Sequence, residues 1–218
     1  MIGPTYHKIN SLYKRDDKGV LLPGQWSTDE LAYLAELEWI WTEKVDGTNI
    51  RITVDAEGGS VVGGRTDRAQ IPAPLLAAIE GLIARAPLAD AFPNGATLYG
   101  EGYGPKIQKG GGNYRDDPSF VLFDVLVDGW WLLPDAVTAV GERLGLDVVP
   151  VVGRGSLAEA EALVARGLHS TWGDFEAEGV VCRPAVPMFS RAGHRVITKI
   201  KAKDLRRLAV AGRDGWAG

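Results

Sequence analysis

The sequence predicts an α+β fold of largely antiparallel sheets with helices packed outside them. Strand-like runs outnumber helical ones along the 218 residues. Several neighbouring runs are separated only by turn-length gaps, which favours hairpins over parallel crossover units. The composition, with 45% hydrophobic and 24% charged residues, is that of an ordinary soluble globular protein. These features predict one mixed domain with a substantial core.

The expected strands are short runs of apolar or alternating residues. Within 119–127, period-two alternation places Val121, Phe123 and Val125 on one face, and Leu122 and Asp124 on the other. An aspartate inside a buried strand needs a polar partner, so Asp124 is expected to have one. The expected strands are 39–45, 49–55, 60–64, 96–101, 119–127, 130–133, 148–152, 178–183 and 195–201.

The expected helices follow capping and proline signals. Residues 27–30 and 156–159 both read as capping boxes that precede leucines at helical spacing, and Gly167 would stop the second helix. Pro74 suits the first turn of another helix. Further helices are expected over 134–144, ending at Gly145, and over about 203–211. Residues 1–26 are mixed, with Gly19, Pro23 and Gly24 marking loop.

Several classes of protein are excluded by what the sequence lacks. There is no internal repeat or long linker, so we expect a single domain over 1–218. The lone cysteine, Cys182, excludes an internal disulfide and a cysteine-rich zinc site. The three histidines show no metal-ligand spacing. Without an N-terminal apolar signal or a run long enough to cross a bilayer, we expect a cytoplasmic protein.

The charge is unevenly distributed. The net charge of −4 argues weakly against a protein covered with phosphate contacts. Residues 191–213, however, hold eight Lys/Arg and one acid, a local net charge of +7. Such a run is either a solvated basic face or a phosphate-binding surface, and the second would make binding salt-sensitive.

Lys44 is the candidate nucleophile. It lies in Glu-Lys-Val-Asp-Gly-Thr-Asn, residues 43–49, at the junction of two strand-like runs, and Gly47 allows a tight backbone turn beside it. A nucleophilic lysine needs a lowered pKa, which burial and nearby cations can provide. By itself the pattern fits an exposed lysine at the end of a strand better than a nucleophile.

Four downstream stretches supply side chains suited to binding a nucleotide. Arg65 follows two glycines and presents a planar fork of donors to a phosphate or ribose. Glu101 ends a short strand and opens a glycine-rich loop that is neither a dinucleotide fingerprint nor a P-loop. Phe123 could stack on a base. Glu178 opens an apolar strand and could bind Mg²⁺ through a carboxylate oxygen.

The last stretch carries two lysines on one strand face. Alternation over 195–201 places Arg195, Lys199 and Lys201 on the same side. Neighbouring lysines repel each other unless an anion lies between them, so this pair indicates an anion-binding site.

Taken in order, these stretches resemble the covalent nucleotidyltransferases, which include polynucleotide ligases and mRNA capping enzymes. The closest resemblance is to the RNA ligase 2 branch, over about residues 38–205. It rests on the motif at 43–49, Tyr-Gly-Glu at 99–101 continuing into Gly-Pro-x-Ile-Gln-Lys, Phe-Asp-Val at 123–125, Ala-Glu-Gly-x-Val at 177–181, and the Lys199–Lys201 pair. The resemblance implies a nucleotidyltransferase (ATP-grasp-like) domain.

The resemblance also implies an activity and roles for residues. The expected activity is ATP-dependent RNA ligation through a lysyl-AMP intermediate on Lys44. The residues expected at the ATP site are Glu43, Lys44, Val45, Asn49, Arg65, Glu101, Phe123, Lys199 and Lys201. Of these, Arg65 and Glu101 would hold the ribose, Phe123 would stack on adenine, and Asn49 would orient the phosphates. Glu178 would bind Mg²⁺ or Mn²⁺, and Lys199 and Lys201 would clamp the α-phosphate.

Three alternatives stay open. At the position of Asp46, the RNA ligase 2 branch often has histidine, whereas DNA ligases more usually have aspartate. The first alternative is therefore a DNA or RNA/DNA nick ligase. A GTP-using capping-type enzyme and a non-catalytic nucleotide-binding relative are the others. Relatives continue into an OB-fold or helical module, whereas 17 residues follow Lys201 here. We therefore expect no accessory domain within 1–218, and a separate protein could supply one.

Overall fold

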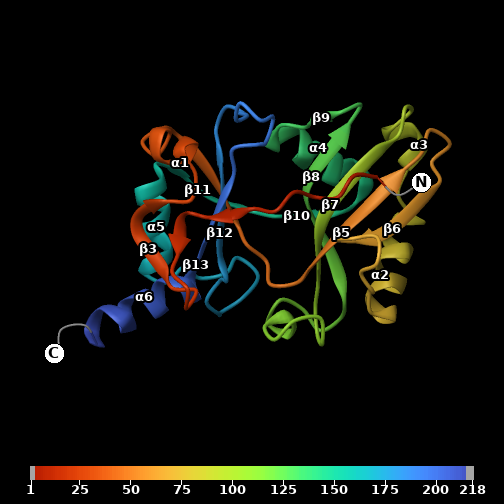
Figure 1. Ribbon diagram of the computed structural model, residues 1–218. Helices are drawn as coiled ribbons and strands as arrows, with labels where there is room; N and C mark the ends of the chain where they lie inside the picture. The colour runs from red at the N-terminus through yellow and green to blue at the C-terminus, as the bar shows by residue number, and fades with distance from the viewer. Residues whose placement is uncertain (1–2, 215–218) are drawn as a thin grey trace. The chain divides into compact units, whose positions relative to one another are not determined.

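The computed structural model describes residues 3–214, with side chains described through residue 210. The chain divides into two compact units (Figure 1). Unit 1 comprises the N-terminal segment through His7 together with Val45–Val149, and unit 2 comprises Lys8–Lys44 together with the chain from Pro150 onward. Most strand pairs in both units are antiparallel, which confirms the predicted α+β class.

Unit 1 is built on a six-stranded sheet with the order β10-β8-β7-β5-β6, and β9 pairs with β8. Helices α2 and α4 both contact β8. Aliphatic side chains from the strands and these helices, among them Ile50, Leu98 and Ile79, form the core on one face of the sheet. The elements of unit 1 are β5 (Thr48–Val54), β6 (Ser60–Gly64), α2 (Ala73–Ile83), α3 (Leu88–Ala91), β7 (Ala96–Tyr103), the 3₁₀ turn η1 (Gly111–Asn113), β8 (Ser119–Val127), β9 (Trp130–Trp131), α4 (Pro134–Leu144) and β10 (Asp147–Val148).

Strand β8 contains an irregularity that corrects the predicted alternation. Tyr99 of β7 pairs with Asp124, but the next residue, Gly100, pairs with Leu122, so Phe123 is an extra residue on β8. A β-bulge of this kind resets which side chains share a face. Leu122 and Val125 consequently belong to the same core, and the prediction that Leu122 lies opposite Val125 was wrong.

Unit 2 is built on a five-stranded sheet with the order β1-β13-β12-β4-β11 and a separate β2–β3 hairpin. Its core includes Trp39, Trp41 and Val180 from the sheet and Leu157 from a covering helix. The elements of unit 2 are β1 (Asn10–Ser11), β2 (Tyr13–Arg15), β3 (Leu21–Trp26), α1 (Asp29–Tyr33), β4 (Trp39–Glu43), β11 (Val151–Gly155), α5 (Leu157–Ala165), β12 (Gly179–Pro184), β13 (Thr198–Lys201) and α6 (Ala202–Asp214).

The capping predictions had mixed outcomes. The capping box of α5 is present, with Ser156 accepting from the Glu159 amide and Glu159 accepting from the Ser156 amide. Helix α4 ends at Gly145 in the left-handed conformation, as predicted. The first capping box was wrong, because Thr28 caps α1 while the Ser27 hydroxyl instead donates to the Ser11 carbonyl.

The N-terminal segment contains strands that the sequence did not predict. Residues 1–26 were expected to be mixed, and β1, β2 and β3 lie within them. The two residues of β1 pair in parallel with β13, which contributes Lys199 and Lys201. A two-residue edge strand is too short to show periodicity in the sequence. Among residues 3–214, the helices are too short or too polar to cross a membrane.

Candidate active site

Lys44 lies at the end of a fully buried strand. All five residues of β4 are buried, and the Lys44 amide donates to the Gly179 carbonyl at 2.9 Å, which fixes the backbone where the strand ends. The side chain of Lys44 keeps 19% of its surface exposed. The predicted nucleophile therefore has a hydrogen-bonded backbone and a partly exposed side chain.

The preceding residue, Glu43, anchors this strand end. Its side chain is 1% exposed, and its carboxylate accepts from the Ser170 hydroxyl at 2.6 Å. The amide and hydroxyl of Thr171 donate to the second oxygen at 2.9 and 3.0 Å. Buried carboxylates need such a set of donors. The Glu43 side chain thus holds the 170–171 segment, while its predicted contact with ATP stays a prediction.

Glu178 joins the candidate nucleophile to one of the paired lysines. One carboxylate oxygen accepts from the Lys44 ammonium at 2.5 Å, and the other accepts from the Lys201 ammonium at 2.5 Å. Burial opposes ionisation of the carboxyl, but the charges of Lys44 and Lys201 outweigh it and hold the pKa of Glu178 below its ordinary value. Three predicted site residues therefore meet in one charged cluster within unit 2.

The pairing of β12 with β13 creates this cluster. Gly179 pairs with Lys201, and Val181 pairs with Lys199. Thr198 and Ile200 are buried whereas both lysines are half-buried, so the predicted alternation of this strand is confirmed over 198–201. Gly179 has a φ of +146°, and a Cβ atom there would collide with the Ile200 carbonyl. Glycine is required for the close approach of the strands beside Glu178.

The predicted strand 195–201 was too long at its N-terminal end. β13 begins at Thr198, and Arg195 instead forms an isolated bridge with Phe189. Arg195 therefore does not belong to the same strand as the two lysines. The side chain of Arg213, the last member of the basic stretch, lies outside the described residues.

A second set of predicted residues lies on the sheet of unit 1. Asn49 on β5 pairs directly with Glu101 on β7. Gly64 pairs with the neighbouring Ile50, so Arg65 follows β6 at the end of the strand where Asn49 lies. Because Ile50 points into the core, Asn49 and Glu101 occupy the opposite face of the sheet.

One feature of this face points to a ligand. The Oδ1 atom of Asn49 is buried and has no hydrogen-bond partner among the residues the structure describes. An unsatisfied buried acceptor is rare in folded proteins and commonly marks a missing ligand or water. A Cβ atom on Gly47 would lie 2.8 Å from the Glu101 Cγ, so only glycine lets the backbone at this position run so close to Glu101.

Phe123 belongs to an aromatic cluster on unit 1. The bulge turns its ring toward Tyr6, with ring centroids 5.1 Å apart and an edge-on geometry. Tyr6 also contacts Tyr99 and Trp131, with centroids 5.1 and 5.6 Å apart. Phe123 is half-buried, and its stacking on adenine stays a prediction.

Asp124 has a polar partner, as the sequence predicts, and that partner is Tyr6. Asp124 is 0% exposed, and its carboxylate accepts from the Tyr6 hydroxyl at 2.5 Å. Tyr6 was not singled out for this role by the sequence, because 118 residues separate the pair. The N-terminal segment is therefore tied to the strand that carries Phe123.

We expect Tyr6→Phe to destabilise unit 1 without enlarging any cavity. Removing the hydroxyl leaves the buried Asp124 carboxylate short of one donor, which costs about 1–3 kcal/mol of unfolding free energy. Urea denaturation followed by tryptophan fluorescence measures the change. Tyr33→Phe, at a tyrosine that is 89% exposed, is the matched control and should unfold like the wild type. Equal stability of the two variants would contradict the assignment.

The arrangement in unit 2 suits covalent group transfer. A lysine amine at the end of a strand lies beside a second cation, which can neutralise a phosphate, and a carboxylate, which can bind a divalent ion. Among the described residues, no group of three or more His, Cys, Asp or Glu is placed to hold a metal ion by itself. A divalent ion would therefore need ligands from a substrate as well.

Comparison with known proteins identifies the family. A family model for RNA ligase matches residues 37–201, which span both Lys44 and the Lys199–Lys201 pair. The chain belongs to the RNA ligase family. This confirms the resemblance drawn from the motifs. No curated protein matched the chain.

Solved structures support the same fold for this RNA ligase family member. RNA ligase of Naegleria gruberi with PPi aligns with a TM-score of 0.64 and 18% identity, covering 94% of this chain and 64% of that one. A variant of that ligase with ATP and Mn aligns at 0.63 and 18%, covering 82% and 54%. An apo variant aligns at 0.64 and 16%, covering 96% and 61%. The chain thus spans less than two thirds of the length of these ligases.

Proposed function

We propose that this protein is an ATP-dependent RNA ligase that joins a 5′-phosphate to a 3′-OH through a lysyl-AMP intermediate. The observation that carries the proposal is the Lys44–Glu178–Lys201 cluster, in which a lysine at a rigid strand end shares one carboxylate with a second cation. Membership of the RNA ligase family supports it. So does the fold shared with a ligase that was solved with ATP and Mn.

In the first step, Lys44 attacks the α-phosphorus of ATP. The amine must leave Glu178 and lose its proton before its lone pair can form the N–P bond. The bond between the α-phosphorus and the bridging oxygen breaks, and pyrophosphate departs. Lys199 and Lys201 neutralise charge on the α-phosphate as it develops in the transition state. The product is AMP joined to Lys44 through a phosphoramide.

Residues of unit 1 are proposed to contact the nucleoside and phosphates. Arg65 and Glu101 would hold the ribose, and Phe123 would stack on adenine. Asn49 would orient the phosphates, which would satisfy its buried Oδ1. Val45, directly after the nucleophile and 3% exposed, would contribute packing beside the nucleotide.

Glu178 fits a divalent ion that arrives with the nucleotide. Mg²⁺ usually keeps several waters and binds through one or two carboxylates together with substrate phosphates. Glu178, a single half-buried carboxylate with a lowered pKa, can act as the one protein ligand in such a set. When bound, Mg²⁺ or Mn²⁺ would supply charge neutralisation at the phosphates.

The later steps transfer AMP to RNA and then release it. An oxygen of the RNA 5′-phosphate attacks the AMP phosphorus, the N–P bond breaks, and Lys44 regains a proton. The 3′-OH then loses its proton and attacks the 5′-phosphorus, which forms the phosphodiester and expels AMP. We propose that both units work as one nucleotidyltransferase domain. A cytoplasmic location and a separate protein that supplies a nucleic-acid-docking domain stay predictions.

Strand joining tests the proposed function. The substrate is a nicked duplex with a labelled 5′-phosphate and either RNA or DNA at the 3′-OH, incubated with ATP and Mg²⁺. We expect sealed product from the RNA 3′-OH at a higher rate than from the DNA 3′-OH. Sealing of the DNA end alone would identify a DNA nick ligase, and dependence on GTP instead of ATP would identify a capping-type enzyme. Either result would contradict the proposal.

A further inference from the structure

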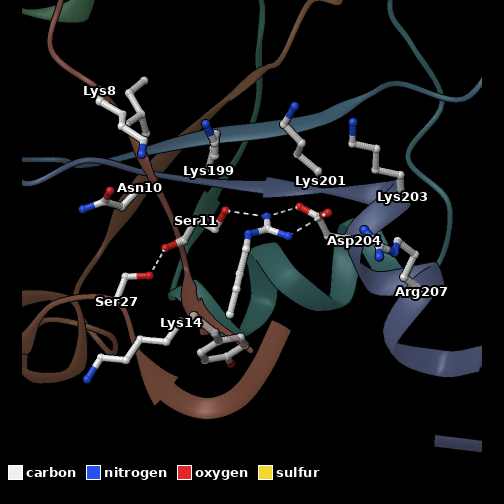
Figure 2. Close-up of a pocket in the computed structure, with 13 residues that line it drawn as sticks. Lys8, Asn10, Ser11, Lys14, Ser27, Lys199, Lys201, Lys203, Asp204 and Arg207 are labelled. Atoms are coloured by element: carbon white, nitrogen blue, oxygen red, sulfur yellow. Dashed lines mark hydrogen bonds and ion pairs between the residues drawn. The ribbon is translucent and has the colours of Figure 1, made fainter. Parts of the chain in front are cut away.

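A groove of about 570 Å³ on unit 2 is lined mainly by polar and basic side chains (Figure 2). The N-terminal strands β1 and β2 contribute one part of the lining, and β13 and the first turns of α6 contribute another. One carboxylate, Asp204, is among the lining residues. The basic residues are Lys8, Lys14, Arg15, Lys199, Lys201, Lys203 and Arg207.

Internal ion pairs neutralise only part of this charge. Arg15 donates to Asp204 at 2.6 Å, and Lys201 pairs with Glu178. Within the part of the chain that the structure describes, neither Lys8 nor Lys14 forms an ion pair. Both side chains are exposed. The groove therefore keeps a surplus of positive charge that favours a polyanion.

The cations extend beyond the reach of a single phosphate. Figure 2 shows the ammonium groups of Lys199, Lys201 and Lys203 in a row on the same side of β13. Lys199 and Lys201, two residues apart on β13, are separated by about 7 Å along the strand, and Lys203 follows in the first turn of α6. Lys8 and Lys14 of the N-terminal segment and Arg207 of α6 also line the groove. Such spacing suits several successive phosphates.

The lining offers little to a nucleobase. Tyr13 is its one aromatic residue, and its hydroxyl donates to Glu161 at 2.8 Å while its ring packs on Trp26, with centroids 5.3 Å apart. Small-molecule pockets are lined predominantly by apolar and aromatic groups, whereas polynucleotide grooves track the backbone with positive charge. The composition therefore favours a phosphodiester backbone over a nucleoside.

We propose that this groove binds the backbone of the RNA strand that carries the 5′-phosphate. The proposal rests on the proposed function, because AMP transfer brings that 5′-phosphate to the α-phosphate held by Lys199 and Lys201. The rest of that RNA strand must then lie on an adjacent surface of the protein. The groove contains these two lysines and continues from them to Lys8, Lys14 and Lys203.

The test compares two triple variants that each remove three positive charges. The groove variant is Lys8→Gln/Lys14→Gln/Lys203→Gln, and the control is Arg85→Gln/Arg166→Gln/Arg191→Gln, at exposed residues that do not line the groove. Binding of a single-stranded RNA with a 5′-phosphate is measured by fluorescence anisotropy, without ATP and after pyrophosphate has removed any bound AMP. Lysyl-AMP formation from labelled ATP is measured in parallel.

We expect the groove variant to bind RNA at least about tenfold more weakly than wild type near 0.1 M salt. The slope of log K against log salt should be shallower by about 2, since three contacts to single-stranded phosphates are lost. The control should bind like wild type, and all three proteins should form lysyl-AMP equally. Loss of lysyl-AMP formation at limiting ATP would assign the groove to the ATP phosphates and overturn the proposal.

Equal RNA affinity of the groove and control variants would also overturn it. The proposed function is judged separately, because wild type that binds RNA through the groove but forms no lysyl-AMP would refute the ligase mechanism and leave the groove assignment intact. Circular dichroism and thermal melting confirm that both variants are folded. All six substituted side chains are exposed, so both variants should melt like wild type.

Discussion

Lys44→Ala is expected to abolish covalent labelling of the protein by α-labelled ATP. No other group can replace the amine that forms the N–P bond, so the loss should be complete rather than graded. The assay incubates protein with ATP and Mg²⁺, denatures it, and measures label that migrates with the chain. Pyrophosphate treatment must come first, because protein purified with AMP already attached would give no signal. γ-Labelled ATP should leave no label, since pyrophosphate departs.

Two further variants separate chemistry from folding. Lys44→Arg keeps a positive charge that can pair with Glu178 but removes the nucleophile, so it should fold like wild type and remain unlabelled. Lys18→Ala, at an exposed lysine, should label normally. Persistent labelling of either Lys44 variant would show that another residue is the acceptor and would refute the mechanism.

Glu178→Ala is expected to slow lysyl-AMP formation by about 10²–10³-fold, by analogy with the loss of one positioned charge at other active sites. The variant removes the carboxylate that both Lys44 and Lys201 contact at 2.5 Å. It also removes the proposed protein ligand of the divalent ion. Single-turnover labelling over a range of Mg²⁺ concentrations measures the effect, and the variant should need more Mg²⁺ than wild type for half-maximal rate.

Glu176→Gln is the matched control for this prediction. Glu176 lies two residues away and pairs with Arg206 on an exposed surface, where ion pairs contribute little. It should label at nearly the wild-type rate. If Glu178→Ala and Glu176→Gln were equally active, the carboxylate shared by Lys44 and Lys201 would be structural rather than part of the catalytic site.

Much of the fold could be predicted because its signals are local. The capping box at Ser156 and the glycine stop at Gly145 both appear where the sequence places them. The short strands before residue 26 could not be predicted, because β1 is formed by pairing with β13, which lies far along the chain. The bulge at Phe123 depends on register with β7, and no local pattern in β8 reveals it.

The contacts within the Lys44–Glu178–Lys201 cluster could not be predicted from the sequence. The motifs singled out Lys44, Glu178 and Lys201, yet the shared carboxylate follows from the pairing of Gly179 with Lys201. The contacts of the Glu43 carboxylate with Ser170 and the neighbouring threonine were not predicted, and its contact with ATP stays a prediction. The partners of buried charged groups depend on how distant segments pack together, and the spacing of residues along the sequence does not reveal that packing.

Mapping the modified residue tests the central claim most directly. The protein is stripped with pyrophosphate, incubated with ATP and Mg²⁺, digested under conditions that preserve phosphoramides, and sequenced by tandem mass spectrometry. We expect one peptide to gain the mass of AMP, with the modification on Lys44. AMP on Lys199, Lys201 or another residue, or no adenylylated peptide at all, would contradict the account.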